Sequence, residues 1–160
     1  GSAAHRDASL KLGADTAVLY KEADFVEVTK EVTDGHGADI ILDIVAGDYV
    51  ARNYDAAAMN GRIVQIGVIG GAAKELNLFP MLSKRLTHIG STLRSRSPEE
   101  KAALIKALTE NVWPLLEKGT VKPQVCKTFP FEKAGEAHQM MDDSKHIGKV
   151  VLIMDEEAHR

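Results

Sequence analysis

Residues 37–47, Gly-Ala-Asp-Ile-Ile-Leu-Asp-Ile-Val-Ala-Gly, decide the fold class of this chain. The stretch is an almost continuous aliphatic run with a glycine at each end. A strand that is covered on both faces has this composition, and such strands belong to parallel sheets. We therefore predict a strand at 38–45 that is buried on both of its faces.

Helical and extended patterns alternate on both sides of this strand. Asp24 and Glu27 are an N-cap and N3 pair that begins a helix, and the Gly35-His36-Gly37 break ends it. Asn60-Gly61 is a predicted turn before a second buried strand. The other expected elements are helices at 4–12, 49–59 and 80–85 and strands at 16–20, 62–68 and 86–93. This alternation predicts an α/β fold with right-handed crossovers.

The second half of the chain has a different pattern. Ser97, Pro98 and Glu100 are typical of a helix start, and the predicted helix runs to about Lys118. Pro114 removes one backbone donor near its end, so we expect a kink there. Four apolar residues at helical spacing are expected to face inward: Leu104, Leu108, Val112 and Leu115. The remaining expected elements are an extended segment at 121–130, a helix at 131–144 and a strand at 149–154.

Length and composition exclude several classes of function. The chain has 160 residues, of which 44% are apolar, and a net charge of −3, which suits one domain or one domain and part of another. The nearly neutral charge balance argues against a nucleic-acid groove or binding to an anionic membrane. Cys126 is the only cysteine, so the chain has no internal disulfide. A single cysteine fits the reducing cytosol, and we expect a cytoplasmic protein.

The sequence lacks the glycine pattern that a doubly wound sheet uses to hold a dinucleotide. That pattern, G-x-G-x-x-G, follows a strand and opens a helix. Here the glycines at 35–37 and at 67–71 have the wrong spacing or context. Either the protein binds no dinucleotide, or the sequence begins after that turn. The residues alone leave both alternatives open.

Seven motifs in order nevertheless resemble one family. They are Gly1-Ser2 with Lys-Leu-Gly-Ala-Asp at 11–15, Val-Leu-Tyr-Lys at 18–21, the run at 37–47, Asn-Gly-Arg-Ile-Val-Gln-Ile-Gly-Val-Ile-Gly-Gly at 60–71, Leu-Arg-Ser-Arg at 93–96, Phe-Pro-Phe-Glu-Lys-Ala-Gly-Glu-Ala-His at 129–138 and His-Ile-Gly-Lys-Val-Val-Leu at 146–152. Together they resemble the zinc-independent quinone oxidoreductase branch of the medium-chain dehydrogenase/reductases, which includes zeta-crystallin.

The resemblance implies a domain organisation. In this family a Rossmann domain, which is a doubly wound parallel sheet, is inserted into a GroES-like catalytic domain. Residues 1–93 would be part of the NAD(P)-binding Rossmann domain, residues 94–154 the segment that returns to the catalytic domain, and residues 155–160 a disordered tail. The family's first strands, its glycine turn and its N-terminal catalytic lobe would precede Gly1. Without those strands the 38–45 strand would have a bare edge, so we expect swapping, dimerisation or a poorly ordered N-terminus.

The resemblance also implies a cofactor site, beginning at the N-terminus. Ser2 and His5 match positions near the adenosine ribose or its 2′-phosphate, and Tyr20 matches a tyrosine near the same phosphate. A neutral Gly1-Ser2 in place of an acidic residue favours NADP over NAD. The alternatives are that Gly1-Ser2 is a cloning remnant and that Tyr20 simply packs at the end of a strand.

Further site residues follow the carboxyl ends of the predicted strands, where open α/β sheets bind ligands. Val45 ends the first buried strand, and the 67–69 residues, Gly67, Val68 and Ile69, end the second. We expect them to line the ribose and nicotinamide, although the glycines could serve only as turn residues. Leu93 and Arg94 resemble a pair near the cofactor, or Arg94 belongs to a solvated basic patch. His146 lies in a turn that is either near the cofactor or on the surface.

The implied reaction is hydride transfer from NADPH to a quinone or another conjugated carbonyl. No side chain is assigned as catalytic, and no histidine spacing argues for a metal. An enoyl or enone reductase is the related alternative. The rival from another class is a non-catalytic dimerisation module, because the Leu86–Leu93 edge strand is expected to pair with its twin in a homodimer. We expect weak or absent NADP(H) binding by the chain alone.

Overall fold

The computed structural model describes residues 1–144 and 146–154, which divide between two compact units, one over Gly1–Pro98 and one that begins at Glu99. The boundary between the units lies a few residues beyond the expected start of the returning segment at 94. The assignment of these units to particular domains stays a prediction, and the expected tail at 155–160 lies outside the described residues. No helix within the described residues is both long and apolar enough to span a membrane.

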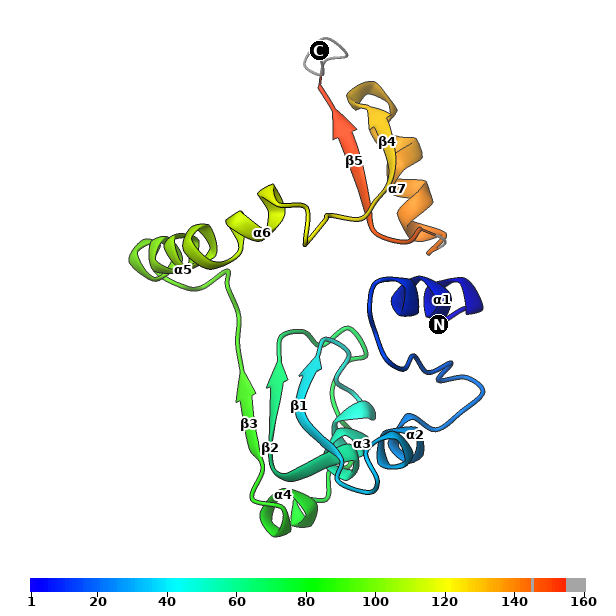
Figure 1. The fold of residues 1–160 in the computed structure, drawn as a ribbon, viewed down its shortest axis with the longest axis vertical. Coiled ribbons are helices and arrows are strands. Elements are labelled where there is room, and N and C mark those ends of the chain that lie inside the picture. The colour runs from blue at the N-terminus through cyan, green and yellow to red at the C-terminus, as the bar shows by residue number, and fades with distance from the viewer. Residues whose placement is uncertain (145, 155–160) are drawn as a thin grey trace. The chain divides into compact units, whose positions relative to one another are not determined.

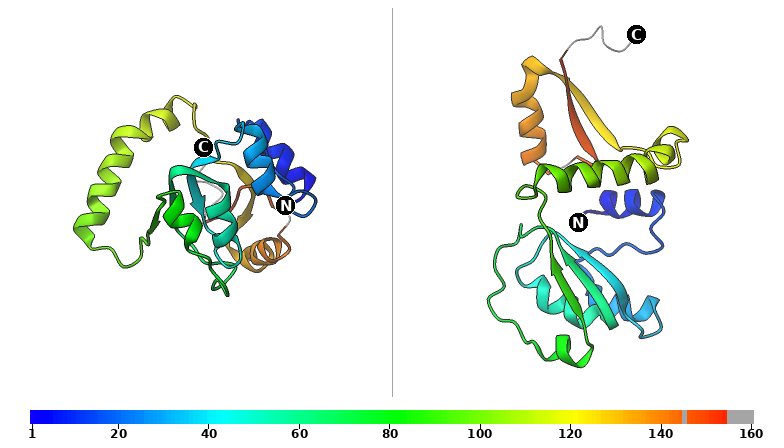
Figure 2. Two further views of the ribbon diagram at one scale, coloured as in Figure 1. Left: turned by 90° about the horizontal axis from the view of Figure 1, so that it is seen from below. Right: turned by 90° about the vertical axis from the view of Figure 1, so that its left-hand side faces the viewer.

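The first unit contains a parallel sheet, as the sequence predicted. Its strands are β1 (Ala38–Asp43), β2 (Ala57–Gln65) and β3 (Thr87–Gly90), in the order β1-β2-β3. Both pairings are parallel, and the three strands run side by side (Figure 1, Figure 2). The helices of this unit are α1 (Ala3–Lys11), α2 (Phe25–Val32), α3 (Tyr49–Ala56) and α4 (Phe79–Ser83). The expected α/β architecture is therefore confirmed.

The core of this unit lies between the sheet and helix α3. Tyr54, Ala57 and Ile63 form a buried cluster, and Ile41 packs against it. The Tyr54 hydroxyl lies 2.9 Å from His88 Nδ1, which gives this polar tip a partner at the core's border. Burial raises the pKa of the Tyr54 hydroxyl. One face of each strand therefore carries the hydrophobic packing of the unit.

The prediction that β1 is buried on both faces is wrong. Ile40 and Leu42 are 71% and 65% exposed, and Ile44, just beyond the strand, is 48% exposed. Side chains alternate between the two faces of a strand, so Ile41 and Asp43 lie on the opposite face. That face is the one that packs toward α3, and no described part of the chain buries the face of Ile40 and Leu42.

The strands also differ in extent from expectation, and β1 and β2 end at Asp43 and Gln65 rather than at 45 and 68. The second strand begins at Ala57 rather than at residue 62. Asn60 takes a left-handed φ of 61°, and the pairing with β1 shifts register between Ala57 and Arg62. The chain thus passes Asn60-Gly61 as an irregularity within β2, and helix α3 ends three residues early. The run at 16–20 forms no strand, and β3 occupies only the middle of the expected 86–93 segment.

Helix α2 begins where the sequence predicted. Asp24 is its N-cap, and the carboxylate accepts a 2.8 Å hydrogen bond from the backbone N–H of Val26. Arg52 on α3 donates to the same carboxylate oxygen at 3.0 Å. The Val26 bond and then Arg52 lower the pKa of Asp24 below its ordinary value of 3.8. Arg52 also lies over the rings of Phe25 and Tyr49, which stack on each other.

We predict that Asp24→Ala lowers the urea midpoint of unfolding at neutral pH. Since the folded-state pKa lies below 3.8, the contribution of the carboxylate is present above that pH and is lost as the pH falls through the lowered value. Urea titrations at neutral pH and well below 3.8 measure the difference. Asp24→Asn is the matched control, because an amide oxygen retains the cap. A difference that stays constant in acid would contradict this account.

The second unit pairs two strands beside a helix. Strands β4 (Val125–Pro130) and β5 (Lys149–Ile153) are parallel, and α7 (Ala134–Asp142) lies along them (Figure 2). The short 3₁₀ turn η1 (Phe131–Lys133) precedes α7. Phe129 on β4 and Ala137 on α7 are buried. The expected elements at 121–130, 131–144 and 149–154 are therefore present with trimmed ends.

The long predicted helix of the second half is broken. It forms α5 (Pro98–Asn111) and α6 (Trp113–Glu117), and Pro114 lies in the first turn of α6. The expected kink is confirmed, since proline donates no bond to the preceding turn. The prediction that its apolar residues face inward is wrong: Leu104 and Leu108 are 43% and 53% exposed. Helix α5 buries no residue in the described chain.

Candidate functional site

The candidate site is the pair of loops that follow β1 and β2. Backbone bonds continue beyond the strands, from Ile69 N–H to Ile44 O at 3.2 Å and from Gly70 N–H to Val45 O at 2.7 Å. A further bond runs from Gly47 N–H to Gly71 O at 3.0 Å. The structure thus brings Val45 and the 67–69 residues together at the carboxyl ends of parallel strands. Ligands bind at this end of open α/β sheets.

The glycines of these loops allow the two backbones to approach closely. A Cβ on Gly67 would lie 2.8 Å from the Ile44 carbonyl oxygen. A Cβ on Gly47, whose φ is +57°, would lie 2.7 Å from the Gly70 oxygen. Contacts this short do not occur in folded proteins, so packing between the loops requires glycine at both positions. The glycines therefore have a structural reason that is independent of any cofactor.

Asp43 holds the first loop, and the sequence analysis missed it. Its carboxylate is buried, and Oδ1 accepts the backbone N–H of Val45 at 2.6 Å and of Ala46 at 3.1 Å. Oδ2 accepts from the side-chain amide of Asn53 on α3 at 2.9 Å. Ala46 has a φ of 59°, which is unfavourable for a residue with a Cβ. The carboxylate therefore stabilises a strained turn at the end of β1.

Gln65 connects the two loops and was also missed. It stands opposite Asp43 in the β1-β2 register. Its Nε2 donates to the carbonyl oxygens of Asp43 at 3.2 Å and Gly67 at 2.6 Å. A signal for both residues was present, because each is a polar residue inside a strongly apolar strand. Buried polar groups of this kind need specific partners.

Val68 and Ile69 give the loop after β2 an apolar outer surface. Their side chains are 68% and 81% exposed. The loop is turned by a bond from Gly71 N–H to the Val68 carbonyl oxygen at 2.9 Å. The loop therefore has an exposed apolar surface and a backbone that hydrogen bonds hold in place. Such a surface suits contact with a planar, partly apolar group.

The structure also brings Ser2, His5 and Tyr20 together. Ser2 is the N-cap of α1, and its hydroxyl lies 2.7 Å from His5 Nδ1. The amino group of Gly1 donates to the Tyr20 hydroxyl at 3.3 Å. These residues line a hollow of about 390 Å³ with Arg6 and the 16–20 segment. The hollow offers hydroxyl and imidazole groups and the guanidinium of Arg6, which is paired with Asp7 at 2.8 Å. Groups of this kind bind phosphate.

The remaining predicted residues are placed less closely. Leu93 and Arg94 lie in a turn after β3, where Leu93 is 60% exposed and its carbonyl accepts from Arg96 N–H at 3.2 Å. The pairing of β3 with β2 extends one residue further, through Ser91 N–H to Gln65 O at 2.9 Å. His146 belongs to the second unit, where its Nδ1 is buried without a partner among the described residues.

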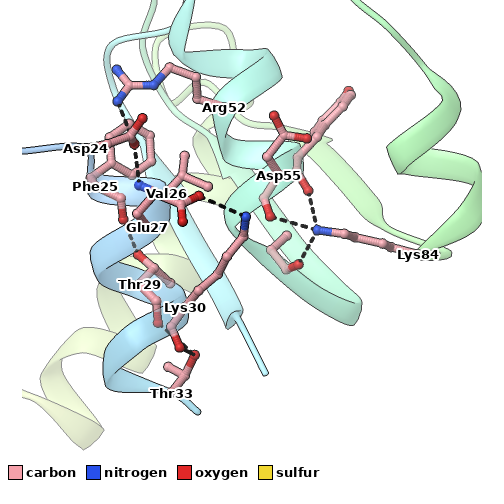
Figure 3. A network of polar contacts seen from close by, with 12 residues as sticks. Asp24, Phe25, Val26, Glu27, Thr29, Lys30, Thr33, Arg52, Asp55 and Lys84 are labelled. Carbon is pink, nitrogen blue, oxygen red and sulfur yellow. Dashed lines mark hydrogen bonds and ion pairs between the residues drawn. The ribbon is translucent and has the colours of Figure 1, made fainter. Parts of the chain in front are cut away.

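A charged hollow of about 700 Å³ lies beside α2 and α3 at the opposite ends of the strands. Lys84 Nζ donates there to three carbonyl oxygens at the end of α3, those of Tyr54, Asp55 and Ala57, at 2.8–2.9 Å (Figure 3). Burial lowers the pKa of Lys84, Asp55 opposes this shift and Lys30 adds to it.

The other lysine and arginine side chains of this hollow are paired locally. Lys30 bonds Glu27 at 3.1 Å, and Arg52 bonds Asp24 at 3.0 Å. The hollow therefore has a structural explanation in the packing of α2 on α3. Among residues 1–144 and 146–154, no group of three or more histidine, cysteine or acidic side chains could hold a metal ion.

The chain is similar to known proteins over nearly its whole length. Residues 12–152 match the family described as zinc-binding dehydrogenase. Quinone oxidoreductase of Rattus norvegicus is 28% identical over 155 residues, which are 96% of this chain and 45% of that protein. The chain thus spans about half the length of the curated relatives it matches.

Two solved structures show the same fold. One is an NAD-dependent alcohol dehydrogenase, with 30% identity and a TM-score of 0.79 over 97% of this chain and 42% of that one. Another is the Escherichia coli quinone oxidoreductase in complex with NADPH, with 27% identity and a TM-score of 0.79 over 96% of this chain and 47% of that one. The match to the family covers most of the chain, as the motifs led us to expect. The chain belongs to the zinc-binding dehydrogenase family.

Proposed function

We propose that this chain forms part of an oxidoreductase that transfers hydride from NADPH to a quinone or another conjugated carbonyl. One observation carries the proposal: the loops after β1 and β2 are joined by backbone bonds at the carboxyl ends of parallel strands. Relatives named as quinone oxidoreductases support the substrate class. The similar Escherichia coli enzyme in complex with NADPH supports the cofactor.

The residues that would hold the cofactor form two groups. Ser2, His5 and Tyr20 would take the 2′-phosphate that distinguishes NADP from NAD, because their hollow offers several donors to an anion. Val45 and the 67–69 loop would take the ribose and nicotinamide. Leu93 and Arg94 would extend this group beside β3, and His146 stays a cofactor contact predicted from the sequence. NADPH supplies the hydride, and the protein binds and orients its ring.

The family's description implies zinc, and the described residues do not fit it. They contain no cluster of metal-ligating side chains, and Cys126 is exposed on β4. We therefore derive no step of the reaction through a metal. For the protein as a whole we propose a cytoplasmic, zinc-independent enzyme, on the resemblance of its motifs to the zinc-independent quinone oxidoreductase branch.

We further propose that the protein is a homodimer that pairs through the expected Leu86–Leu93 edge. β3 is one of the two outer strands of the sheet, so its free edge offers unpaired backbone groups to another chain. Its residues include no proline or lysine, which commonly protect such edges. A non-catalytic assembly module remains the competing proposal for the chain by itself.

Titration with NADPH tests the cofactor proposal. We expect millimolar or weaker binding, on the order of a Kd above about 1 mM, because the glycine turn that grips the pyrophosphate is missing from this sequence. NMR amide shifts should move at Ser2, His5, Gly67 and Val68. NADH is the matched control, since without a 2′-phosphate it should shift the 67–69 loop and leave Ser2 and His5 unchanged. Shifts confined to other residues, or submicromolar binding, would contradict the proposal.

A further inference from the structure

The side chain of Gln65 uses both of its amide protons to join two loop ends. One proton goes to the carbonyl oxygen of Asp43, the last residue of β1, at 3.2 Å. The other goes to the carbonyl oxygen of Gly67, in the loop after β2, at 2.6 Å. Gln65 and Asp43 are neighbours in the strand pairing, so the amide crosses directly from one strand to the other.

The amide oxygen of the same side chain has no partner. Gln65 Oε1 is buried, and no group in the described part of the chain donates to it. Reversing the amide would not help, because the oxygen would then face two carbonyl oxygens. A buried acceptor without a partner lowers the stability of the folded state. The two donated hydrogen bonds therefore hold the side chain in this orientation, and its amide oxygen stays without a partner.

The bond to Gly67 also orients the next peptide N–H. The carbonyl of Gly67 and the N–H of Val68 belong to one planar trans peptide group and point in opposite directions. Because Gln65 fixes the carbonyl, it also directs the Val68 N–H away from the buried amide. No described group accepts a backbone hydrogen bond from Val68. The loop therefore presents a fixed donor at the carboxyl end of the sheet.

We propose that Gln65 is a positioning residue, which aims the Val68 N–H at the carboxamide oxygen of the nicotinamide. This inference rests on the proposed function. Strain and unpaired polar groups that a fold retains against its own stability concentrate at functional sites. The two bonds that the amide donates, and not packing alone, therefore explain a side chain whose oxygen stays without a partner at this position.

Gln65→Met separates positioning from packing, because methionine has a similar size and no amide. We expect its urea midpoint to change little, because removal of the unpartnered Oε1 offsets the loss of the donors to the carbonyl oxygens of Asp43 and Gly67. Amide hydrogen exchange at Ile69 and Gly70 should nevertheless accelerate about tenfold, since two bonds that hold the loop are lost. The NADPH-induced shift at Val68 should also disappear. Gln139→Met is the control. The Gln139 amide on α7 is exposed, and it donates a hydrogen bond to the nearby Asp143 carboxylate.

Two results would overturn the proposal. The first is a Gln65→Met protein with a lower midpoint and unchanged exchange at Ile69 and Gly70, which would show a packing role. The second is measured on the unchanged protein and does not depend on whether the variant folds. If the side-chain amide protons of Gln65 exchange with solvent as fast as those of Gln139, the Gln65 amide does not hold the loop. If NADPH shifts no residue of the unchanged protein, the cofactor assignment fails, while the exchange rates still decide whether Gln65 holds the loop.

Discussion

Asp43→Ala is expected to destabilise the first unit by about 3 kcal/mol or more. The substitution leaves three donors without an acceptor: the backbone N–H groups of Val45 and Ala46 and the side-chain amide of Asn53. Each buried donor without a partner costs about 1 kcal/mol or more. Ala46 would also lose the bond that holds its left-handed conformation. Urea unfolding followed by circular dichroism measures the loss.

Asp43→Asn is the matched control for this prediction. Its amide oxygen accepts the two backbone N–H groups, and Asn53 can turn its own oxygen toward the new amide group. We expect it to retain most of the stability, within about 1.5 kcal/mol. Equal losses in the two variants would mean that the negative charge, rather than the set of hydrogen bonds, stabilises the turn. A loss below about 1 kcal/mol for Asp43→Ala would show that these bonds do not hold the loop.

Lys84→Met should cost about 2 kcal/mol, the second largest effect that we expect. The ammonium group serves three carbonyl oxygens at the end of α3, and it links that end to the chain that follows α4 (Figure 3). Carbonyls at the end of a helix have no partner within the helix, and a cation there also interacts favourably with the helix dipole. The urea midpoint of unfolding reports the change.

Lys30→Met is the control for Lys84. Lys30 lines the same hollow and forms an ion pair with Glu27, but the side chains are 45% and 71% exposed. Exposed pairs of this kind contribute about 0.5 kcal/mol or less. Similar losses in the two variants would show that the positive charge of the hollow matters, and that the three carbonyl bonds do not.

The sequence predicted best those features of the fold that depend on residues close together in the chain. The cap at Asp24, the kink at Pro114 and the presence of a parallel strand that begins at Ala38 all follow from local rules of hydrogen bonding and composition. The start of β2 was missed because Asn60-Gly61 is typical of a turn. Asparagine also tolerates the left-handed conformation inside an irregular strand, and only the pairing with β1 shows which of the two it adopts.

Burial and the site were harder to predict for a different reason. The apolar character of Ile40 shows what its side chain favours, but it does not say whether a partner lies opposite. The strand-end rule pointed to Val45 and Gly67, which lie two residues beyond the observed ends of β1 and β2. It did not locate Asp43 and Gln65, whose importance depends on hydrogen-bond partners from another strand and helix. Their isolation within aliphatic runs was the available signal.

The row formed by Ile40, Leu42 and Ile44 has a consequence for the colloidal behaviour of the purified chain. Uncovered aliphatic strands attract one another in water, and electrostatic repulsion between molecules is what opposes their aggregation. That repulsion is weak for a net charge of −3, and it vanishes near the isoelectric point of about 6.1. Mildly acidic buffers therefore favour precipitation, and moderately alkaline buffers keep the molecules apart.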